Sequence, residues 1–289
     1  MLFVIENAKE ENMKKFVLSY KSKQWNEDFA YVCDDYGFVL DGATAVTSQK
    51  FSNLDSDAEW YSKTMGNFLI NNLEDKSKSI FEIVRSGIKS IKKEYKKLSK
   101  GSEVIDFPSS TLSLARIIGE NVEFYTISDS IILVEDIFGN VFEVFDSRNA
   151  INDSIRMSYI QGKVYNEKLT ILEARQKYPD IIFDGRKLRN TIGHQYVLAD
   201  DEDAADEGIA FSMEKKFIKK IVILSDGFSQ CFDLFKFVSP EEFVKKINCE
   251  KDAIKMYEKL VKMQNKDFDC KKFLRFKKTD DASLVCMNF

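Results

Sequence analysis

The feature that most constrains this chain is a set of acidic residues placed where predicted strands begin or end. The first group flanks a predicted hairpin of residues 29–40, with Glu27 and Asp28 before it and Asp41 after it. A hairpin brings its two ends together, so these three side chains should lie side by side at one end of a sheet. The carboxylates would then repel one another or take up protons unless a cation compensates them.

The residue types available for metal binding narrow the identity of that cation. The chain has a single histidine, His194, which excludes His-rich zinc sites and leaves a Ser-His-Asp triad possible only through that residue. No G-x-S-x-G nucleophile motif accompanies it. The five cysteines are far apart and expected to be reduced structural thiols: Cys33, Cys231, Cys249, Cys270 and Cys286. A metal in this chain should therefore be bound by oxygen, which favours magnesium or manganese and also suits calcium.

The acidic pattern recurs at three further strand boundaries. These are marked by Asp129, by Asp226, and by the pair Asp280 and Asp281. Each one alone has a plain backbone explanation, because aspartate is common in turns. Together they indicate a shared centre, since two divalent ions about 3.5–4 Å apart need several shared carboxylates and can activate water for attack on phosphorus.

The remaining pattern predicts an α+β chain. Strands are expected at residues 16–20, 111–118, 122–127, 131–135, 141–145, 196–198, 220–224 and 283–287. Helices are expected from the Ser56–Glu59 capping box through Leu69, at 79–98, after Ser239-Pro240, and at 253–263. Residues 148–188 are weakly periodic and are interpreted as an insert or flap with one short helix at about 169–176. The acidic segment 200–207 is expected to be a solvated loop.

Composition bounds the architecture and the partners. No linker interrupts the 289 residues, so a single domain of residues 1–289 is expected. The formal net charge of -4 gives no reason to expect nucleic acid or an anionic membrane as the main partner. No apolar stretch approaches the roughly 18 residues that a membrane span needs. We therefore expect a cytoplasmic protein, and a monomer. The abundance of Lys, Asn, Ile and Phe is typical of a bacterium of low GC content.

Seven short motifs occur in a fixed order along nearly the whole chain. They are Asn26-Glu27-Asp28, Asp41-Gly42, Ser109-Ser110-Thr111, Ser128-Asp129-Ser130, the segment 188–193, Leu224-Ser225-Asp226-Gly227 and Asp280-Asp281-Ala282-Ser283. In this order and spacing they resemble the metal-dependent protein phosphatase family, also called PP2C, in its bacterial form. The resemblance implies a four-layer α-β-β-α sandwich, in which two antiparallel sheets are flanked by helices.

The resemblance also implies roles for the acidic residues around two Mn²⁺ or Mg²⁺ ions. Asp41 would bridge the two ions. Glu27 and the carbonyl group of Gly42 would serve one ion, and Asp226 with Asp280 would serve the other. In bacterial members an aspartate matching Asp129 holds a third, looser ion together with the one matching Asp226. Asp28 would orient a metal-bound water from outside the ligand set.

Two positions depart from the family pattern. Lys23 stands where the family usually has an arginine that grips phosphate as a bidentate fork, and lysine keeps the charge but not the fork. Ala43 stands where eukaryotic members have a histidine that serves as general acid. Thr44 is a poor substitute, so the loss could cost about 10²- to 10⁴-fold in rate. Aryl phosphates, which leave easily, should suffer least.

The sequence thus predicts a serine/threonine protein phosphatase in which a metal-bridging hydroxide attacks phosphorus and Lys23 helps to hold the phosphate. Its substrate would be a phosphorylated protein, and it would oppose a serine/threonine kinase. A first alternative is a catalytically weak or inactive PP2C-like module that binds a phosphoprotein or a regulator, as the lysine and alanine departures suggest. A second alternative is a phosphatase for small phosphoesters with the same metal site.

Overall fold

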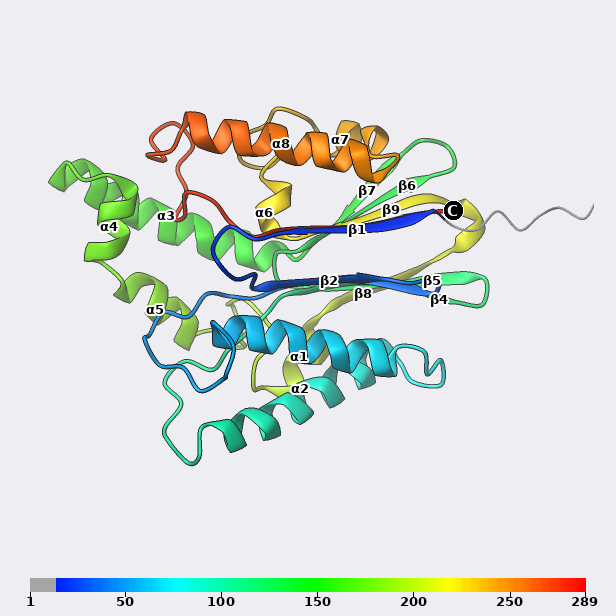
Figure 1. Cartoon of the computed structure of the whole chain (residues 1–289), viewed down its shortest axis with the longest axis horizontal. Coiled ribbons are helices and arrows are strands. Elements are labelled where there is room, and N and C mark those ends of the chain that lie inside the picture. The colour runs from blue at the N-terminus through cyan, green and yellow to red at the C-terminus, as the bar shows by residue number, and fades with distance from the viewer. Residues whose placement is uncertain (1–13) are drawn as a thin grey trace, which may run out of the picture.

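The structure is a computed structural model that describes residues 14–289, and its strands form two antiparallel five-stranded sheets. The strands are β1 (Lys15–Tyr20), β2 (Asp28–Val32), β3 (Tyr36–Asp41), β4 (Leu112–Ile118), β5 (Asn121–Ile127), β6 (Ile131–Asp136), β7 (Val141–Val144), β8 (Ile209–Glu214), β9 (Ile218–Leu224) and β10 (Ala282–Asn288). One sheet has the order β1-β10-β9-β6-β7 and the other the order β2-β3-β4-β5-β8. The two sheets stack face to face (Figure 1).

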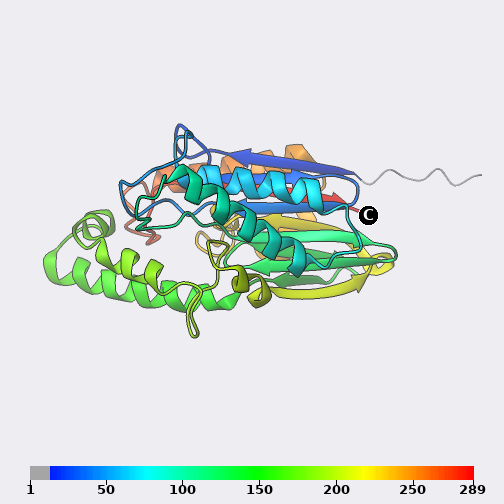
Figure 2. The same ribbon diagram turned by 90° about the horizontal axis from the view of Figure 1, so that it is seen from below.

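Helices cover both outer faces of the stacked sheets. The α-helices of the described residues are α1 (Asp57–Asn72), α2 (Ile80–Leu98), α3 (Ser147–Glu167), α4 (Ile171–Lys177), α5 (Asp180–Lys187), α6 (Asp226–Ser229), α7 (Pro240–Lys246) and α8 (Glu250–Lys266). Helices α1 and α2 lie on one outer face, and α7 and α8 lie on the other (Figure 1). The predicted four-layer α-β-β-α sandwich is therefore confirmed. Helices α3, α4 and α5 extend beyond one end of the sheets (Figures 1 and 2).

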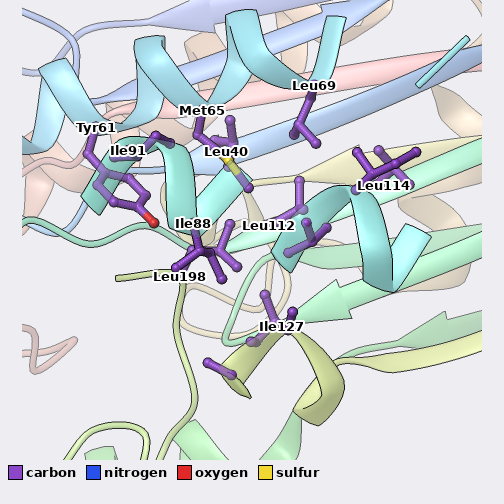
Figure 3. Packing of buried hydrophobic residues seen from close by; sticks show 14 of the residues in the cluster. Leu40, Tyr61, Met65, Leu69, Ile88, Ile91, Leu112, Leu114, Ile127 and Leu198 are labelled. Atoms are coloured by element: carbon purple, nitrogen blue, oxygen red, sulfur yellow. The ribbon is translucent and has the colours of Figure 1, made fainter. Parts of the chain in front are cut away.

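Three apolar clusters hold these layers together. Between the sheets, side chains such as Val39, Phe124 and Ile223 come from both sheets and are fully buried. Between α1, α2 and their sheet, residues including Leu40, Met65 and Ile88 interdigitate (Figure 3). A third cluster joins α7 and α8 to the other sheet. Burial on both faces explains why residues 38–40 of β3 and 221–224 of β9 are continuously apolar in sequence rather than alternating.

The helix-start signals in the sequence are largely confirmed. Ser79 caps α2 in a complete capping box with Glu82. Ser239 accepts a hydrogen bond from the Glu242 backbone N–H, with proline in the first turn of α7. At α1 only half of the predicted box forms, because the carboxylate of Glu59 accepts a hydrogen bond from the Asp55 N–H instead of closing back on the cap.

The main corrections concern residues 147–214. The segment interpreted as an irregular flap with one short helix contains three helices, α3 to α5. Helix α3 escaped prediction because its isoleucines 151 and 155 are 64% exposed, so its apolar residues do not follow one buried face. The predicted strand 196–198 is only an isolated bridge between Leu198 and Ser110. The acidic segment forms a 3₁₀ helix over Glu202–Glu207. Strand β8 was not predicted.

Within residues 14–289, none of the helices combines the length and the apolar character that crossing a bilayer requires.

Candidate metal centre

All the predicted acidic groups lie at one end of the sandwich, and strand register explains why. Asp28 is the register partner of Asp41, which confirms that the hairpin brings its ends together. In the other sheet, Leu224 pairs with both Leu284 and Ile131. The residues just beyond this rung, in the turn before β6, in the turn after β9 and before β10, therefore meet at the same end. These turns carry Asp129, Asp226 and Asp280.

Burial and mutual repulsion both act on these carboxyl groups. Burial is the larger effect at Asp41, and the charges of Asp28, Asp226, Asp280 and Asp129 add to it, so its pKa lies well above its usual value. The pKa of Asp226 is also raised well above its usual value, first by burial and then by the charges of Asp280 and Asp129. Burial raises the pKa of Asp28 to about 7, and burial with the nearby Asp153 charge raises that of Asp129 to about 6. The fold thus brings together carboxyl groups whose negative charges are not compensated by the protein's own hydrogen-bond donors.

The chemistry of this cluster fits divalent cations. Both carboxylate oxygens of Asp28 and the Oδ1 atom of Asp226 are buried without a hydrogen-bond partner. A buried, unpartnered carboxylate oxygen is costly, and a hard cation satisfies it. The side chains as they stand in residues 14–289 do not, however, form a ready-made group of three or more ligands. The assignment of Glu27, Asp41, Gly42, Asp129, Asp226 and Asp280 as ligands stays a prediction.

Glu27 already has partners. Its Oε2 atom accepts a hydrogen bond from the Lys23 ammonium at 2.9 Å and another from the Thr44 hydroxyl. Burial by itself would raise the pKa of Glu27, but these hydrogen bonds outweigh it, and the pKa lies below its usual value. Lys23, predicted to hold the phosphate, also donates to Thr44 Oγ1 at 3.0 Å. Two of its three N–H donors are thus used within the protein.

Asp281 has a structural role that the sequence reasoning missed. Its Oδ1 atom accepts hydrogen bonds from the Ser22 backbone N–H at 2.6 Å and from the Ser22 hydroxyl at 2.8 Å. Its Oδ2 atom accepts one from the Glu27 backbone N–H at 2.7 Å. This one carboxylate therefore fixes the loop that carries Lys23 and Glu27. The acidic pair in the sequence pointed to it, but the local pattern could not distinguish its role from that of Asp280.

Lys277 was not singled out from the sequence either. Its ammonium donates a hydrogen bond to Asp280 Oδ1 at 2.8 Å. Burial lowers the pKa of this ammonium, but the attraction of Asp280, Asp226 and Asp41 more than offsets that and raises it above its usual value. Several lysines lie close together in this part of the sequence, and nothing in the local pattern distinguishes Lys277 as the one that contacts the acidic cluster.

A cavity of about 680 Å³ opens over the acidic cluster. Its floor is lined by Asp41, Asp129, Asp226 and Asp280, and its walls include arginines from the segment 147–189 and from the loop before β10. Most of these arginines have acidic partners within the protein. Arg186 and Arg189 share Asp106, and Arg156 pairs with Asp153. An anionic ligand would thus meet a surface of balanced charge above a strongly acidic floor.

Neither His194 nor the cysteines contribute to this site. His194 lies in a turn closed by a hydrogen bond from its N–H to the Thr191 carbonyl, and it does not line the cavity. The five cysteines are all free. A triad built on the single histidine has no support in this geometry.

Two glycines allow the close backbone approach on which the cluster depends. A Cβ atom at position 42 would lie 2.4 Å from the Glu27 carbonyl oxygen, and one at position 227 would lie 1.9 Å from the Asp281 carbonyl oxygen. Real Cβ atoms do not approach this closely, so the backbone would have to move. Gly42 and Gly227 thus set the spacing between the strand ends.

Gly227→Ala is expected to lower the free energy of unfolding by about 1–3 kcal/mol, because the added methyl group overpacks a site closed by backbone. Urea denaturation of the two proteins measures this difference. Gly162→Ala is the matched control: nothing lies within 4 Å of its added Cβ, and it sits within α3. That control should be neutral or slightly stabilising. Equal stability of Gly227→Ala and wild type would contradict the close approach.

Comparison with known proteins gives one family and a consistent set of folds. A family profile described as "Protein phosphatase 2C" matches residues 19–263. The serine/threonine phosphatase PstP/Ppp of Mycobacterium tuberculosis is similar with a TM-score of 0.56 and 16% identity, covering 96% of this chain and 98% of that chain. The catalytic domain of PstP in complex with 2 manganese ions has a TM-score of 0.55 and 16% identity, covering 96% and 97%. Stp1 of Staphylococcus aureus has a TM-score of 0.56 and 12% identity, covering 96% and 95%. No curated protein matches the chain in sequence.

Proposed function

Because this chain belongs to the protein phosphatase 2C family, we propose that it is a metal-dependent phosphatase that hydrolyses phosphoserine and phosphothreonine in proteins. One observation carries the proposal. Asp226 at the floor of an open cavity, and Asp28 beside the cavity-lining Asp41, present buried carboxylate oxygens that have no hydrogen-bond partner among the described residues. Such a surplus of unpaired oxygen ligands is what a pair of hard divalent cations requires.

Two Mn²⁺ or Mg²⁺ ions are the proposed cofactors. The catalytic domain of the serine/threonine protein phosphatase PstP, which shares this fold, is described in complex with 2 manganese ions. In this chain Asp41 would contact both ions, with Glu27 and the Gly42 carbonyl on one side and Asp226 and Asp280 on the other. Asp129, whose carboxylate accepts a hydrogen bond from Asn149, would hold a third ion with Asp226. When bound, the ions supply an activated water and neutralise charge that develops on the phosphoryl oxygens.

The chain's own residues then position the reactants. Asp28 is buried beside Asp41 and has both carboxylate oxygens free, so it can accept a hydrogen bond from the attacking water. Lys23 is held by Glu27 and Thr44 at the edge of the cluster, and its remaining N–H can donate to a phosphoryl oxygen. Thr44 lines the cavity, whereas Ala43 offers no proton to the leaving group. We expect the phosphorylated side chain of a substrate protein to enter through this cavity. A serine/threonine kinase would phosphorylate that protein.

One observation favours a second candidate, a catalytically weak or inactive member that binds a phosphoprotein or a regulator. Two of the predicted ligands, Glu27 and Asp280, already form ion pairs with Lys23 and Lys277. Lysines that remain in these positions would compete with divalent ions. The two candidates differ in one measurable property, namely turnover at saturating metal concentration.

The proposal is tested by hydrolysis of p-nitrophenyl phosphate and of a phosphothreonine peptide, with Mn²⁺, Mg²⁺, Ca²⁺ or EDTA. We expect turnover of both substrates with Mn²⁺ or Mg²⁺, and none after EDTA treatment. The aryl phosphate should be the faster substrate, because its leaving group needs no proton from the missing histidine. Binding of Mn²⁺ without turnover of either substrate would favour the inactive module instead.

A further inference from the structure

Lys277 lies beside Asp280, one of the predicted metal ligands. Its ammonium lies 2.8 Å from Asp280 Oδ1, and the Asp280 side chain is only 15% exposed. The same Oδ1 atom accepts the Asp281 backbone N–H at 3.0 Å. The Oδ1 atom of Asp280 thus already has two donors, one of them a full positive charge.

The segment that carries Lys277 is anchored on the protein rather than free to follow its side chain. Arg275, two residues earlier, is buried and forms an ion pair with Asp267 at 2.8 Å, while its remaining N–H groups bond to backbone carbonyls of Gln264, Asp267, Phe273 and Lys278. Asp267 in turn accepts hydrogen bonds from three backbone N–H groups of residues 271–273. The loop is therefore wound tightly around one ion pair.

Helix α4 holds the other side of the same segment. Arg175 donates a hydrogen bond to the carbonyl of Phe276, the residue just before Lys277. Phe276 and Leu274 pack against an apolar cluster that contains Ile160 and Ile171 of α3 and α4. Because Arg275 and Phe276, the two residues before Lys277, are both fixed, the backbone of Lys277 is held where its side chain reaches the acidic cluster.

The adjacent lysine shows that this placement is specific to one residue. Lys278 carries the same charge one position later, but its ammonium lies 3.7 Å from the centroid of the Phe268 ring. It makes no ion pair within the described residues. The loop therefore directs one lysine into the carboxylate cluster and the next away from it.

We propose that Lys277 acts as a built-in cation of the metal centre, competing with the divalent ion that Asp226 and Asp280 would bind. A divalent ion such as Mg²⁺ would lie about 2.0–2.1 Å from a carboxylate oxygen of Asp280, close to the ammonium that contacts Oδ1, and the two positive charges would repel each other. The ion on this side therefore binds only when Lys277 moves away from Asp280. The inference rests on the proposed metal-dependent function. Competition by Lys277 raises the metal concentration that is needed to fill this site.

Mn²⁺ titration of the metal-free full-length chain by isothermal titration calorimetry tests the proposal. Lys277→Met should bind Mn²⁺ at the Asp226–Asp280 side at least about tenfold more tightly than wild type. Lys278→Met removes the same charge from the next position and should leave the titration unchanged. Lys277→Arg keeps the charge and should resemble wild type. In the double variant Lys277→Met/Asp280→Asn the gain should disappear, which locates the improved site.

The outcomes separate failure of this inference from failure of the proposed function. Equal Mn²⁺ affinities of wild type and Lys277→Met, with binding intact in both, would overturn the role of Lys277 and leave the metal centre standing. An equal gain in Lys278→Met would also overturn it, because the effect would then be one of net charge. Absence of Mn²⁺ binding in every variant would overturn both. If Lys277→Met does not fold, as judged by its thermal melt, Lys277→Gln replaces it in the same comparison.

Discussion

Asp226→Asn is expected to lower metal-dependent phosphatase turnover by more than about 10²-fold. Asp226 follows β9 and presents a buried, unpartnered Oδ1 atom at the cavity floor, where it contributes to the cluster that raises the pKa of Asp41. Residues that merely support metal ligands typically account for about 10–100-fold, so a ligand itself should account for at least that much. Steady-state hydrolysis of p-nitrophenyl phosphate at saturating Mn²⁺ measures the loss.

Asp233→Asn is the matched control for this variant. Asp233 lines the same cavity, burial raises its pKa as well, and it is not among the predicted ligands. Its carboxylate is engaged by the Ser229 hydroxyl. Its replacement should therefore leave turnover within a few-fold of wild type. Comparable losses in both variants would mean that general cavity charge, and not ligation by Asp226, controls activity.

The metal-free protein is expected to lose stability as pH rises from about 4 to 7. Burial raises the pKa of Asp28 to about 7 and that of Asp129 to about 6, from an ordinary value of 3.8. Between the two values the folded state keeps protons that the unfolded state has lost. Protonation therefore stabilises the folded state at the low end of the window, and this contribution disappears as pH passes the folded-state pKa. The expected decrease in unfolding free energy is on the order of a few kcal/mol.

Thermal melting of EDTA-treated and Mn²⁺-loaded protein across this pH window measures the effect. Saturating Mn²⁺ should abolish the decline, because the bound cations compensate the ionised carboxylates. Asp28→Asn should flatten the metal-free profile, since it removes one titrating carboxyl group and its repulsion. Groups with lowered pKa, such as Glu27 and Asp57, act in the opposite sense only at lower pH. A metal-free protein whose stability rises steadily between pH 4 and 7 would contradict the crowded cluster.

The sequence was sufficient for many of the strands and helices because their signals are local, whereas their stacking into a sandwich was implied by the resemblance to the PP2C family. The period of apolar residues, the caps at Ser79 and Ser239, and the hairpin of residues 29–40 depend on neighbours within a few positions. Hairpin geometry alone then placed Asp28 beside Asp41. Helix α3 and strand β8 were missed for the converse reason. Most of their side chains are exposed to solvent, so apolar residues do not recur in them at the spacing of a helix or a strand.

The chemical types of the acidic residues, and their places at strand boundaries, were determined by the sequence. Only the tertiary structure decided which of them contact groups that are distant in the sequence. Lys23 reaches Glu27 through a local i,i+4 contact, whereas Asp281 reaches Ser22 across 259 positions. Lys277 is only three positions from Asp280, but its loop is fixed by Arg175 of α4, which reaches the Phe276 carbonyl across 101 positions. Electrostatic pairing depends on distance in space, and a local pattern carries no record of which distant charge the fold will bring into contact.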